Sequence, residues 1–518
     1  MALDPRTPVL VGSGQVTSRP DPARPLAGRP EPVELMARAL LAAAEDASGV
    51  APGAAAPAGR ALLERAASLR VVAMLGTRLP NPGLAVAGRL GIGPAEIGLT
   101  SIGGNMPQTL LHHSASAIAR GQIDTVLVCG AEAVYTRGLA RRSPGGTTAL
   151  GWLEQDPAAT DDPVPFGDGR DGVSAFEAAR GVALPVTVYP LFENALRAAY
   201  GWDLDGHRAR IGALWSSFSA VAAANPYAWL PEVRTPDQIT VPSAGNRMVS
   251  FPYTKLCTAN IQVDQGAAYI LSSVAAARAA GVPEERWVFP LAGADAHDHW
   301  FVSERADLHS SPAIAAAGRA ALALAGVGVD DLGPVDLYSC FPCAVQMAAA
   351  ALGLPVDDPS RPLTVTGGLT FAGGPGNNYA THAIATVARQ LRDAPGSVGL
   401  VTGLGWYATK HAVGVYGSRP PADGGRAGFA WRDVQAEVDA GPRVAVAEGA
   451  TGPVTVETYT VGYGRDGAPE RGIVACRTPS GGRTWGRVED PGELTALVDA
   501  EGIGRTGTLG PDGRLALA

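Results

Sequence analysis

Residues capable of chemistry gather directly after an apolar run in the second half of the chain. Tyr338, Cys340 and Cys343 follow a strand predicted at residues 335–337. A tyrosine hydroxyl at such a place can donate to an oxyanion or enolate, or act as an acid or base if its pKa is lowered. The alternative is a buried tyrosine bonded to its own loop. The Cys-x-x-Cys spacing has no second cysteine pair, which argues against a zinc site and against a redox role.

Two further polar runs lie around this segment. Residues 406–411 combine two aromatic side chains with Lys410 and His411. Residues 295–299 read DAHDH, a run compatible with metal binding. Because no third ligand motif stands out, we interpret DAHDH as a solvated loop and predict no metal site.

Glycine turns stand at two places where the backbone would approach a ligand. Gly103 and Gly104 end an apolar run and precede a helix that closes at Gly121. The free N–H groups and positive dipole end of such a helix stabilise an oxyanion or thiolate. A second glycine-rich run at residues 367–376 leaves room for a ligand against the backbone.

The elements that position these residues alternate between strand and helix. Apolar runs at 7–14, 70–75 and 125–129 predict strands, and residues 31–47 predict an amphipathic helix. Such alternation is typical of a largely parallel sheet that is covered on both faces. The pattern loosens from residue 135 to about 263 and resumes near residue 288.

One octet occurs twice. Residues 113–120 read HSASAIAR and residues 382–389 read HAIATVAR. A glycine turn precedes each octet and a hydrophobic strand follows it. These matching flanks predict a duplicated α/β core, whereas two unrelated alanine-rich helices are the alternative.

The last part of the chain changes character. Residues 419–428 have the composition of a linker. Short strands predicted at 454–463, 472–477, 506–509 and 515–517 then suggest a small β-barrel of the oligonucleotide/oligosaccharide-binding (OB) type. We expect this part to fold separately and to be dispensable for the core.

With these motifs the chain resembles the thiolase superfamily over residues 5–417, most closely the sterol-carrier-protein-type thiolase-like proteins of actinobacteria. The resemblance rests on Gly130-Ala131-Glu132, Cys340-Phe341, Gly373-Gly374-Pro375 and the run 263–268. It implies an α/β fold with a duplicated βαβαβαββ core in five α-β-α-β-α layers. The implied units are 1–285, with a loop domain at about 135–262, then 286–418, and an additional OB-like domain at 426–518.

The same alignment identifies three vacated positions. Gly104, Gly374 and Val401 stand where active thiolases carry the nucleophilic cysteine, the activating histidine and the second cysteine. Tyr338 and Cys340 remain as candidate catalytic residues. The resemblance implies coenzyme A (CoA) or acyl-CoA as the ligand and no tightly bound cofactor. The residues expected to contact the ligand, with the last two at its phosphates, are Asn105, Gly373, Gly374, Gly403, Lys410 and His411.

Three functions stay open. The chain is an acyl-CoA-binding protein of lipid or sterol metabolism related to acetyl-CoA acyltransferases, a retro-aldolase that uses Tyr338 on a β-hydroxyacyl-CoA, or a non-catalytic CoA-ester scaffold. Such lyases generally depend on a partner subunit, whereas thiolases suggest a homodimer through the N-terminal half. A thermal-shift panel of CoA and acyl-CoA esters would narrow these functions most.

Composition narrows the class of protein. The 518 residues are 46% hydrophobic and carry a net charge of -8, which argues against a partner held through nucleic-acid phosphates. No apolar run is long enough to span a bilayer. Five scattered cysteines do not form a disulfide framework, so we expect a reducing cytoplasm.

Overall fold

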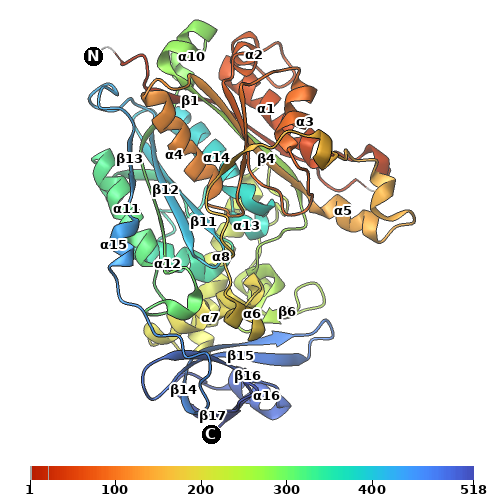
Figure 1. Ribbon diagram of the computed structural model, residues 1–518, viewed down its shortest axis with the longest axis vertical. Coiled ribbons are helices and arrows are strands. Elements are labelled where there is room, and N and C mark those ends of the chain that lie inside the picture. Colours follow the sequence, from red (N-terminus) through yellow and green to blue (C-terminus); the bar gives the residue numbers. More distant parts are fainter. Residues whose placement is uncertain (1–2, 22) are drawn as a thin grey trace.

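The computed structural model describes residues 3–21 and 23–518, which form two stacked central sheets and a third sheet at one end (Figure 1). The first central sheet belongs to the N-terminal half and has six strands. Its order is β1 (Pro8–Thr17), β8 (Asp264–Ser273), β4 (Thr125–Ala133), β2 (Ser68–Val71), β3 (Glu96–Thr100) and β5 (Val164–Phe166). Strands β4, β2, β3 and β5 run parallel, whereas β8 is antiparallel to both of its neighbours.

The second central sheet belongs to the C-terminal half and has five strands. Its order is β10 (Leu332–Asp336), β11 (Val398–Gly405), β12 (Lys410–Gly417), β9 (Phe289–His297) and β13 (Ala430–Asp433). The parallel pair β10–β11 places the loop that begins at Tyr338 beside the turn that follows Gly405.

Two helices lie between the central sheets, α4 (Met106–Ala119) and α14 (Tyr379–Asp393). Each packs on strands of both sheets, and the two helices pack on each other. The outer face of the first sheet carries α1 (Pro32–Ser48), α3 (Pro82–Leu90) and α10 (Val274–Ala280), while α2 (Pro57–Glu64) packs on α1 and α10. The second sheet is covered by α11 (Pro312–Ala325), which packs on α12 (Pro342–Leu352). This arrangement confirms the predicted five-layer core.

Strand β8 shows how burial determines the sequence pattern. All ten of its residues are buried, because α1 covers one face and the central helices cover the other. A strand covered on both faces reads as a continuous run of small and apolar residues rather than as an alternation. This is why the run DQGAAYILSS has no polar face.

The matching octets lie on the paired central helices. Residues 113–120 belong mostly to α4, which precedes β4, and residues 382–389 belong to α14, which precedes β11. Each helix therefore occupies the same place in its own half, in agreement with the predicted duplication. His382 is buried, whereas His113 is partly exposed beside the Trp431 ring.

A long excursion leaves the first sheet after β4 and returns at β8. It contains α5 (Val134–Arg141), α6 (Ala175–Ala179), α7 (Pro185–Ala199), α8 (Leu204–Ala224), α9 (Pro236–Thr240), β5, and the short strands β6 (Met248–Ser250) and β7 (Tyr253–Thr254). Strand β5 pairs with the outer edge of β3, so this edge is occupied by the same chain. Its two longest helices are α7 and α8.

The third sheet contains the strands predicted near the C-terminus and one that sequence reasoning missed. Its main strands are β14 (Gly452–Tyr463), β15 (Pro469–Arg477), β16 (Arg483–Val488), β17 (Thr506–Leu509) and β18 (Leu515–Leu517), and β6 and β7 of the excursion join it because β6 pairs with β14. Helix α16 (Pro491–Asp499) packs on β14 and β15, whereas α15 (Gln435–Asp439) packs on α11 and β9. An isolated bridge between Arg487 and Arg514 brings β16 near β18. Among the described residues no continuous ladder joins these strands, so the sheet is curled rather than closed into the predicted barrel.

This C-terminal region does not stand apart from the core, contrary to our expectation of a separately folding, dispensable part. The Arg483 guanidinium is fully buried, pairs with Glu457, and donates to the backbone oxygens of Val302, Ser303 and Arg305. The indole of Trp485 donates to Ser303 Oγ over 2.8 Å. Buried apolar residues of β15 and β16 join the same hydrophobic cluster as the second central sheet. Removal of the region would therefore expose core surface.

The predicted linker is also anchored. The Gly424 carbonyl oxygen accepts hydrogen bonds from Asp4 N and Thr7 Oγ1 of the N-terminal half. Residues 430–433, which we assigned to the additional domain, form β13 and pair with β9 of the second central sheet. No helix among the described residues is both long and apolar enough to cross a membrane.

Candidate functional site

Four loops meet at one end of the central helices and enclose a cavity of about 1040 Å³. They are the turn before α4, the loop after β10, the glycine run after α13 (Gly368–Phe371) and the turn between β11 and β12. The first two loops contribute Gly103, Gly104, Tyr338, Cys340 and Phe341, and the last two contribute Gly374, Gly376, Asn377, Leu404, Trp406 and Tyr407. The structure therefore brings together the loops that the sequence singled out.

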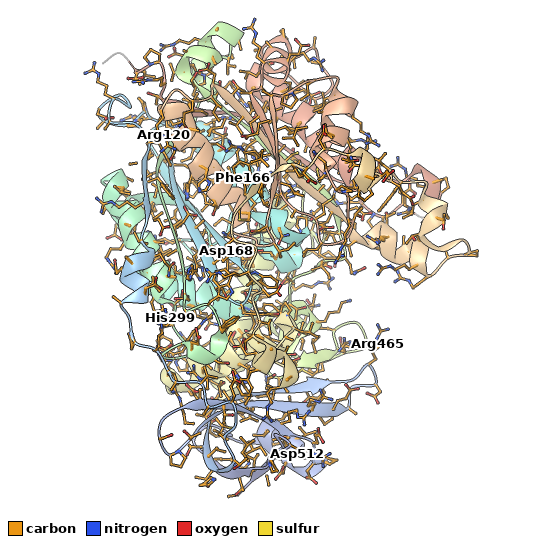
Figure 2. The ribbon with its side chains drawn as sticks, in the orientation of Figure 1. Arg120, Phe166, Asp168, His299, Arg465 and Asp512 are labelled. Carbon is orange, nitrogen blue, oxygen red and sulfur yellow. The ribbon has the colours of Figure 1, made fainter. Side chains whose placement is uncertain are left out.

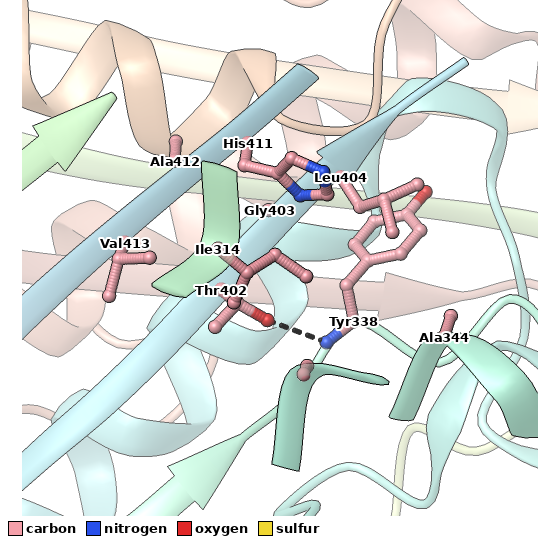
Figure 3. A pocket seen from close by; sticks show the side chains of 10 residues that line it. Ile314, Tyr338, Ala344, Thr402, Gly403, Leu404, His411, Ala412 and Val413 are labelled. Atoms are coloured by element: carbon pink, nitrogen blue, oxygen red, sulfur yellow. Dashed lines mark hydrogen bonds between the residues drawn. The ribbon is translucent and has the colours of Figure 1, made fainter. Parts of the chain in front are cut away.

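Tyr338 occupies the space beside Gly104. Strand β10 ends just before it, and the Tyr338 backbone N–H donates to Thr402 Oγ1 over 2.8 Å (Figure 3). A β-carbon at Gly104 would lie 2.2 Å from the Tyr338 hydroxyl oxygen and 2.5 Å from the Leu404 carbonyl oxygen. The phenol thus stands where a side chain at Gly104 would begin. A cysteine cannot be placed at Gly104 without moving its neighbours.

The environment of Tyr338 favours hydrogen-bond donation over proton abstraction. Burial raises the pKa of Tyr338 well above its ordinary value, so the phenol keeps its proton at neutral pH. The ring packs edge-on against Tyr379 at 5.3 Å between centroids. The Tyr379 hydroxyl donates to Asp336 over 2.8 Å, which fixes the wall behind Tyr338. Burial raises the pKa of Asp336 to about 6, although several hydrogen bonds oppose this shift.

Cys340 lines the cavity but is a poor nucleophile. Burial raises the pKa of its thiol to about 12, and only the thiolate is strongly nucleophilic. Cys343 is fully buried, with its Sγ 3.4 Å from the Tyr189 carbonyl oxygen. Both cysteines are free thiols. Neither of them supplies the missing acyl acceptor.

The other two vacated positions differ from Gly104 and from each other. A β-carbon at Gly374 would make ordinary contacts, the nearest at 3.4 Å from the Asn260 carbonyl oxygen, so an added methyl group fits without overlap. Val401 is fully buried in β11 and does not reach the cavity. Gly373, with φ of 116°, lies against Gln265 and lines a separate void of about 10 Å³.

The structure separates the remaining predicted ligand contacts from the cavity. Asn105, Lys410 and His411 line another recess of about 340 Å³, on the other side of the turn before α4. The Lys410 Nζ donates to the Ile102 and Asp168 carbonyl oxygens over 2.5 and 3.2 Å, and burial lowers its pKa to about 8. Gly403 lines a void of about 10 Å³ behind the Tyr338 ring, together with His411 (Figure 3). Lys410 and His411 therefore do not lie at the mouth of the large cavity.

The run DAHDH is not a solvated loop. It spans the end of β9, where Asp295 accepts hydrogen bonds from His112 Nδ1, Thr109 Oγ1 and Trp431 Nε1 over 2.5 to 2.6 Å. Asp298 is buried and accepts from Ser311 Oγ and from the Ala313 N–H. Among the described residues no group of three or more His, Cys, Asp or Glu side chains could hold a metal ion. These acids hold the second central sheet to its surroundings.

Sequence reasoning missed the cations of the cavity. Its lining includes Arg78, Arg247, Lys255 and Arg465, but no aspartate, glutamate or histidine. In the part of the chain that the structure describes, none of the four cations has a carboxylate oxygen within 4.0 Å. They come from three distant segments without a shared motif, so only the folded chain brings them together.

Comparisons with known proteins agree with this geometry. Residues 433–514 match a family model described as the thiolase-like protein type 1 additional C-terminal domain. The chain is similar to a monomeric SCP2-thiolase-like protein type 1 (STLP1) from Mycobacterium smegmatis, with 34% identity, full coverage of both chains and a TM-score of 0.81. A search of curated proteins finds no match.

Two more distant structures show the fold alone. An aldolase complex, Ltp2–ChsH2(DUF35), is 18% identical, with a TM-score of 0.57 over 80% of this chain and 98% of that chain. The dimeric peroxisomal thiolase of Saccharomyces cerevisiae is 13% identical, with a TM-score of 0.53 over the same shares.

Proposed function

Because the chain belongs to the SCP2-thiolase-like protein type 1 family, we propose that it binds an acyl-CoA thioester in the large cavity and does not carry out thiolysis. The observation that carries this proposal is the cavity itself, about 1040 Å³ at the meeting point of the four loops. Ligand pockets typically enclose about 300–1,000 Å³, so this one suits a long ligand. We propose that this ligand belongs to lipid or sterol metabolism, which the resemblance to thiolases supports.

The lining supports a thioester with an apolar acyl group. Phe341, Leu369, Leu404 and Trp406 contribute apolar and aromatic surface near Gly104. The Tyr338 hydroxyl faces the same space and keeps its proton, so it can donate to the thioester carbonyl oxygen. We place the thioester beside Tyr338 and Gly104, with the acyl chain along the apolar wall.

Thiolysis needs groups that the cavity lacks. A thiolate must accept the acyl group, a base must generate that thiolate, and a second group must move the α-proton. Gly104, Gly374 and Val401 stand at those positions, and the Cys340 thiol keeps its proton because its pKa is about 12. A site without these three groups can still position a substrate and donate hydrogen bonds to it, but it cannot form an acyl-enzyme.

A retro-aldolase is the second candidate function, and Tyr338 is the observation that favours it. Its hydroxyl can stabilise the enolate that forms when a β-hydroxyacyl-CoA is cleaved. The reaction also needs a base for the β-hydroxyl proton, yet no carboxylate or imidazole lines the cavity in the described part of the chain. This candidate therefore requires a base from elsewhere, such as a partner subunit, and we rank it second.

We further propose that the chain does not form a homodimer through the edge of its N-terminal sheet. Strand β5 of the same chain already pairs with β3 at this edge. The similar M. smegmatis protein is described as monomeric. Sedimentation of the purified chain as a single copy at micromolar concentration is the expected result.

A thermal-shift panel tests the proposed ligand. A ligand that binds only the folded state raises the melting temperature. We expect a rise with CoA, a larger rise with a long-chain acyl-CoA, and none with the free fatty acid at equal concentration. Absence of any shift at saturating acyl-CoA contradicts the proposal.

A matched pair of variants locates the effect. Gly374→Phe would fill the open side of the cavity, whereas Gly93→Phe adds the same ring where a β-carbon meets no atom within 4 Å. The first variant should lose the acyl-CoA shift and the second should keep it. Equal shifts in both would place the ligand outside this cavity.

A further inference from the structure

The four cations of the large cavity come from separate parts of the chain. Arg78 follows β2, Arg247 and Lys255 flank the β6–β7 hairpin of the excursion, and Arg465 belongs to the turn between β14 and β15. Because the whole chain has a net charge of -8, a lining with four positive and no negative side chains does not reflect composition. It indicates a site for a multiply charged anion.

The turn that carries Arg465 has a defined conformation. Gly464 N donates to the Ala468 carbonyl oxygen over 2.9 Å, and Ala468 N donates to Asp466 Oδ1 over 3.1 Å. Gly467 adopts φ of 86°, which favours glycine. Asp466 is thus engaged by its own turn. Figure 2 labels Arg465 on the side of the C-terminal region nearest the excursion, and Asp512 at the far end.

Backbone pairing couples this turn to the excursion. Gly462 of β14 pairs with Ser250 of β6, and Phe251 N donates to the Val461 carbonyl oxygen over 2.8 Å. The segment between Arg247 and Lys255 and the segment that carries Arg465 therefore belong to one sheet. This sheet fixes the segment that carries Arg465 beside the segment that carries Arg247 and Lys255, and Figure 1 shows the β14–β15 hairpin beside β6.

We propose that the C-terminal region is part of the binding site, and that Arg465, with Arg247 and Lys255, binds the phosphate groups of the ligand's nucleotide. This inference rests on the proposed acyl-CoA ligand. The CoA nucleotide carries a diphosphate and a further phosphate on its ribose. Arginine forks bind phosphate oxygens through two parallel hydrogen bonds, and lysine adds a point charge. The region thereby acts as a specificity element for the nucleotide end.

Calorimetric titration of two ligands tests this inference. A long-chain acyl-CoA carries the nucleotide, whereas the corresponding acyl-pantetheine ends before it. Arg465→Gln should weaken binding of the acyl-CoA about tenfold, as expected for one charge-assisted hydrogen-bonding group. Its affinity for the acyl-pantetheine should equal that of the parent protein. Raised salt should narrow the difference between parent and variant for the acyl-CoA.

Arg471→Gln is the matched control. Arg471 lies on β15 of the same hairpin, is exposed, and does not line the cavity, so its loss changes the net charge equally. It should leave the affinities for both ligands unchanged. Thermal unfolding of both variants should match that of the parent, because neither side chain has a carboxylate partner among the described residues.

The other possible outcomes contradict the inference about phosphate recognition, the proposed function, or both. Unchanged acyl-CoA affinity in Arg465→Gln overturns the role of Arg465 and leaves the proposed function standing. An equal loss for acyl-CoA and acyl-pantetheine shows that the variant distorts the cavity, which also overturns phosphate recognition. If the parent protein binds neither ligand, both the inference and the proposed function fail.

Discussion

The large cavity and the recess beside it both contain charged and polar side chains. The two sets of side chains differ in how far neighbouring protein groups hydrogen-bond or pair with them. We define the Lys410 cluster as Asn105, Asp295, Lys410 and His411, which line the recess on the far side of the α4 turn, together with Asp298, which lies beside His411. In the cluster, Lys410 and both aspartates are bonded to neighbouring protein groups. In the cavity, none of the four cations has a carboxylate partner among the described residues, and Tyr338 lines the same space.

This difference separates structural from ligand-binding roles. A buried charge must be paired or hydrogen-bonded, and once it is, it has little left to offer a ligand. Lys410 and His411 satisfy this condition within the protein. Arg78, Lys255 and Arg465 are exposed, and Arg247 donates to the Met248 carbonyl oxygen, so their charges remain available to an anion. Residue type alone favoured Lys410 and His411 as ligand contacts, whereas the pairing pattern of the folded chain favours the four cations of the cavity.

The largest expected effect tests whether the Lys410 cluster is structural. Asp298→Ala should destabilise the protein by about 3–5 kcal/mol, because it leaves two buried donors, the Ser311 hydroxyl and the Ala313 N–H, without their acceptor. Urea unfolding measures this change. Asp512→Ala, at an exposed carboxylate far from both sites, should change the unfolding free energy by less than about 0.5 kcal/mol. If Asp298→Ala lowers the unfolding free energy as little as Asp512→Ala does, the Lys410 cluster has no structural role and the comparison between the two regions fails.

A smaller effect tests the packing of Tyr338 against Gly104. Gly104→Cys should cost about 1–3 kcal/mol of stability, because the new side chain overlaps the phenol. Tyr338→Ala in the same chain should recover only part of this loss, since the Leu404 carbonyl oxygen also crowds the position. Gly374→Ala is the control and should be neutral or slightly stabilising, by up to about 1 kcal/mol. If Gly104→Cys proves as mild as Gly374→Ala, Tyr338 does not fill the vacated position.

The pH dependence of stability sharpens the comparison at Lys410. Its pKa is about 8 in the folded protein and near 10.5 in an unfolded chain, so the unfolded state binds more protons between these values. The Lys410 contribution to the free energy of unfolding therefore rises as the pH increases from about 8 to about 10.5. Lys410→Met should remove that contribution, which denaturant titrations of parent and variant at pH 7.5 and 9.5 would reveal. Parallel curves for the two proteins would indicate that burial does not perturb Lys410.

The smallest expected effect concerns the Tyr338 hydroxyl. Tyr338→Phe should change the unfolding free energy by less than about 0.5 kcal/mol, because the hydroxyl faces the cavity rather than a protein partner. Acyl-CoA should still bind. If the chain is instead a retro-aldolase, this variant should abolish cleavage of a β-hydroxyacyl-CoA while binding persists. Equal turnover in parent and variant would remove Tyr338 from any mechanism.

Much of the fold could be predicted because its signals are local. The helix at 31–47, the strands at 125–129 and 454–463, and the repeated octet each depend on periodicity within one segment. The four loops of the site could also be located, since each follows a recognisable strand or glycine run. Gly104 and Gly374 were both identified from the sequence. Only the structure shows that Tyr338 fills the space beside Gly104, whereas a small side chain has room at Gly374.

The parts that could not be predicted depend on contacts distant in the chain. Arg465 reaches the cavity only because β14 pairs with β6, which lies about two hundred residues earlier. The burial of Asp298 and the anchoring of the C-terminal region through Arg483 have the same origin. The predicted linker likewise carries no sequence sign that Gly424 bonds to the N-terminal half.

Native mass spectrometry of the protein with a long-chain acyl-CoA tests the central claim most directly. One spectrum distinguishes a non-covalent complex from an acyl-enzyme by mass. We predict a one-to-one complex that carries the intact acyl-CoA, releases it on collisional activation, and leaves unmodified protein. A protein mass increased by the acyl group alone would reveal a working nucleophile, and absence of any complex would show that the cavity does not bind acyl-CoA. Either result would contradict the proposed function.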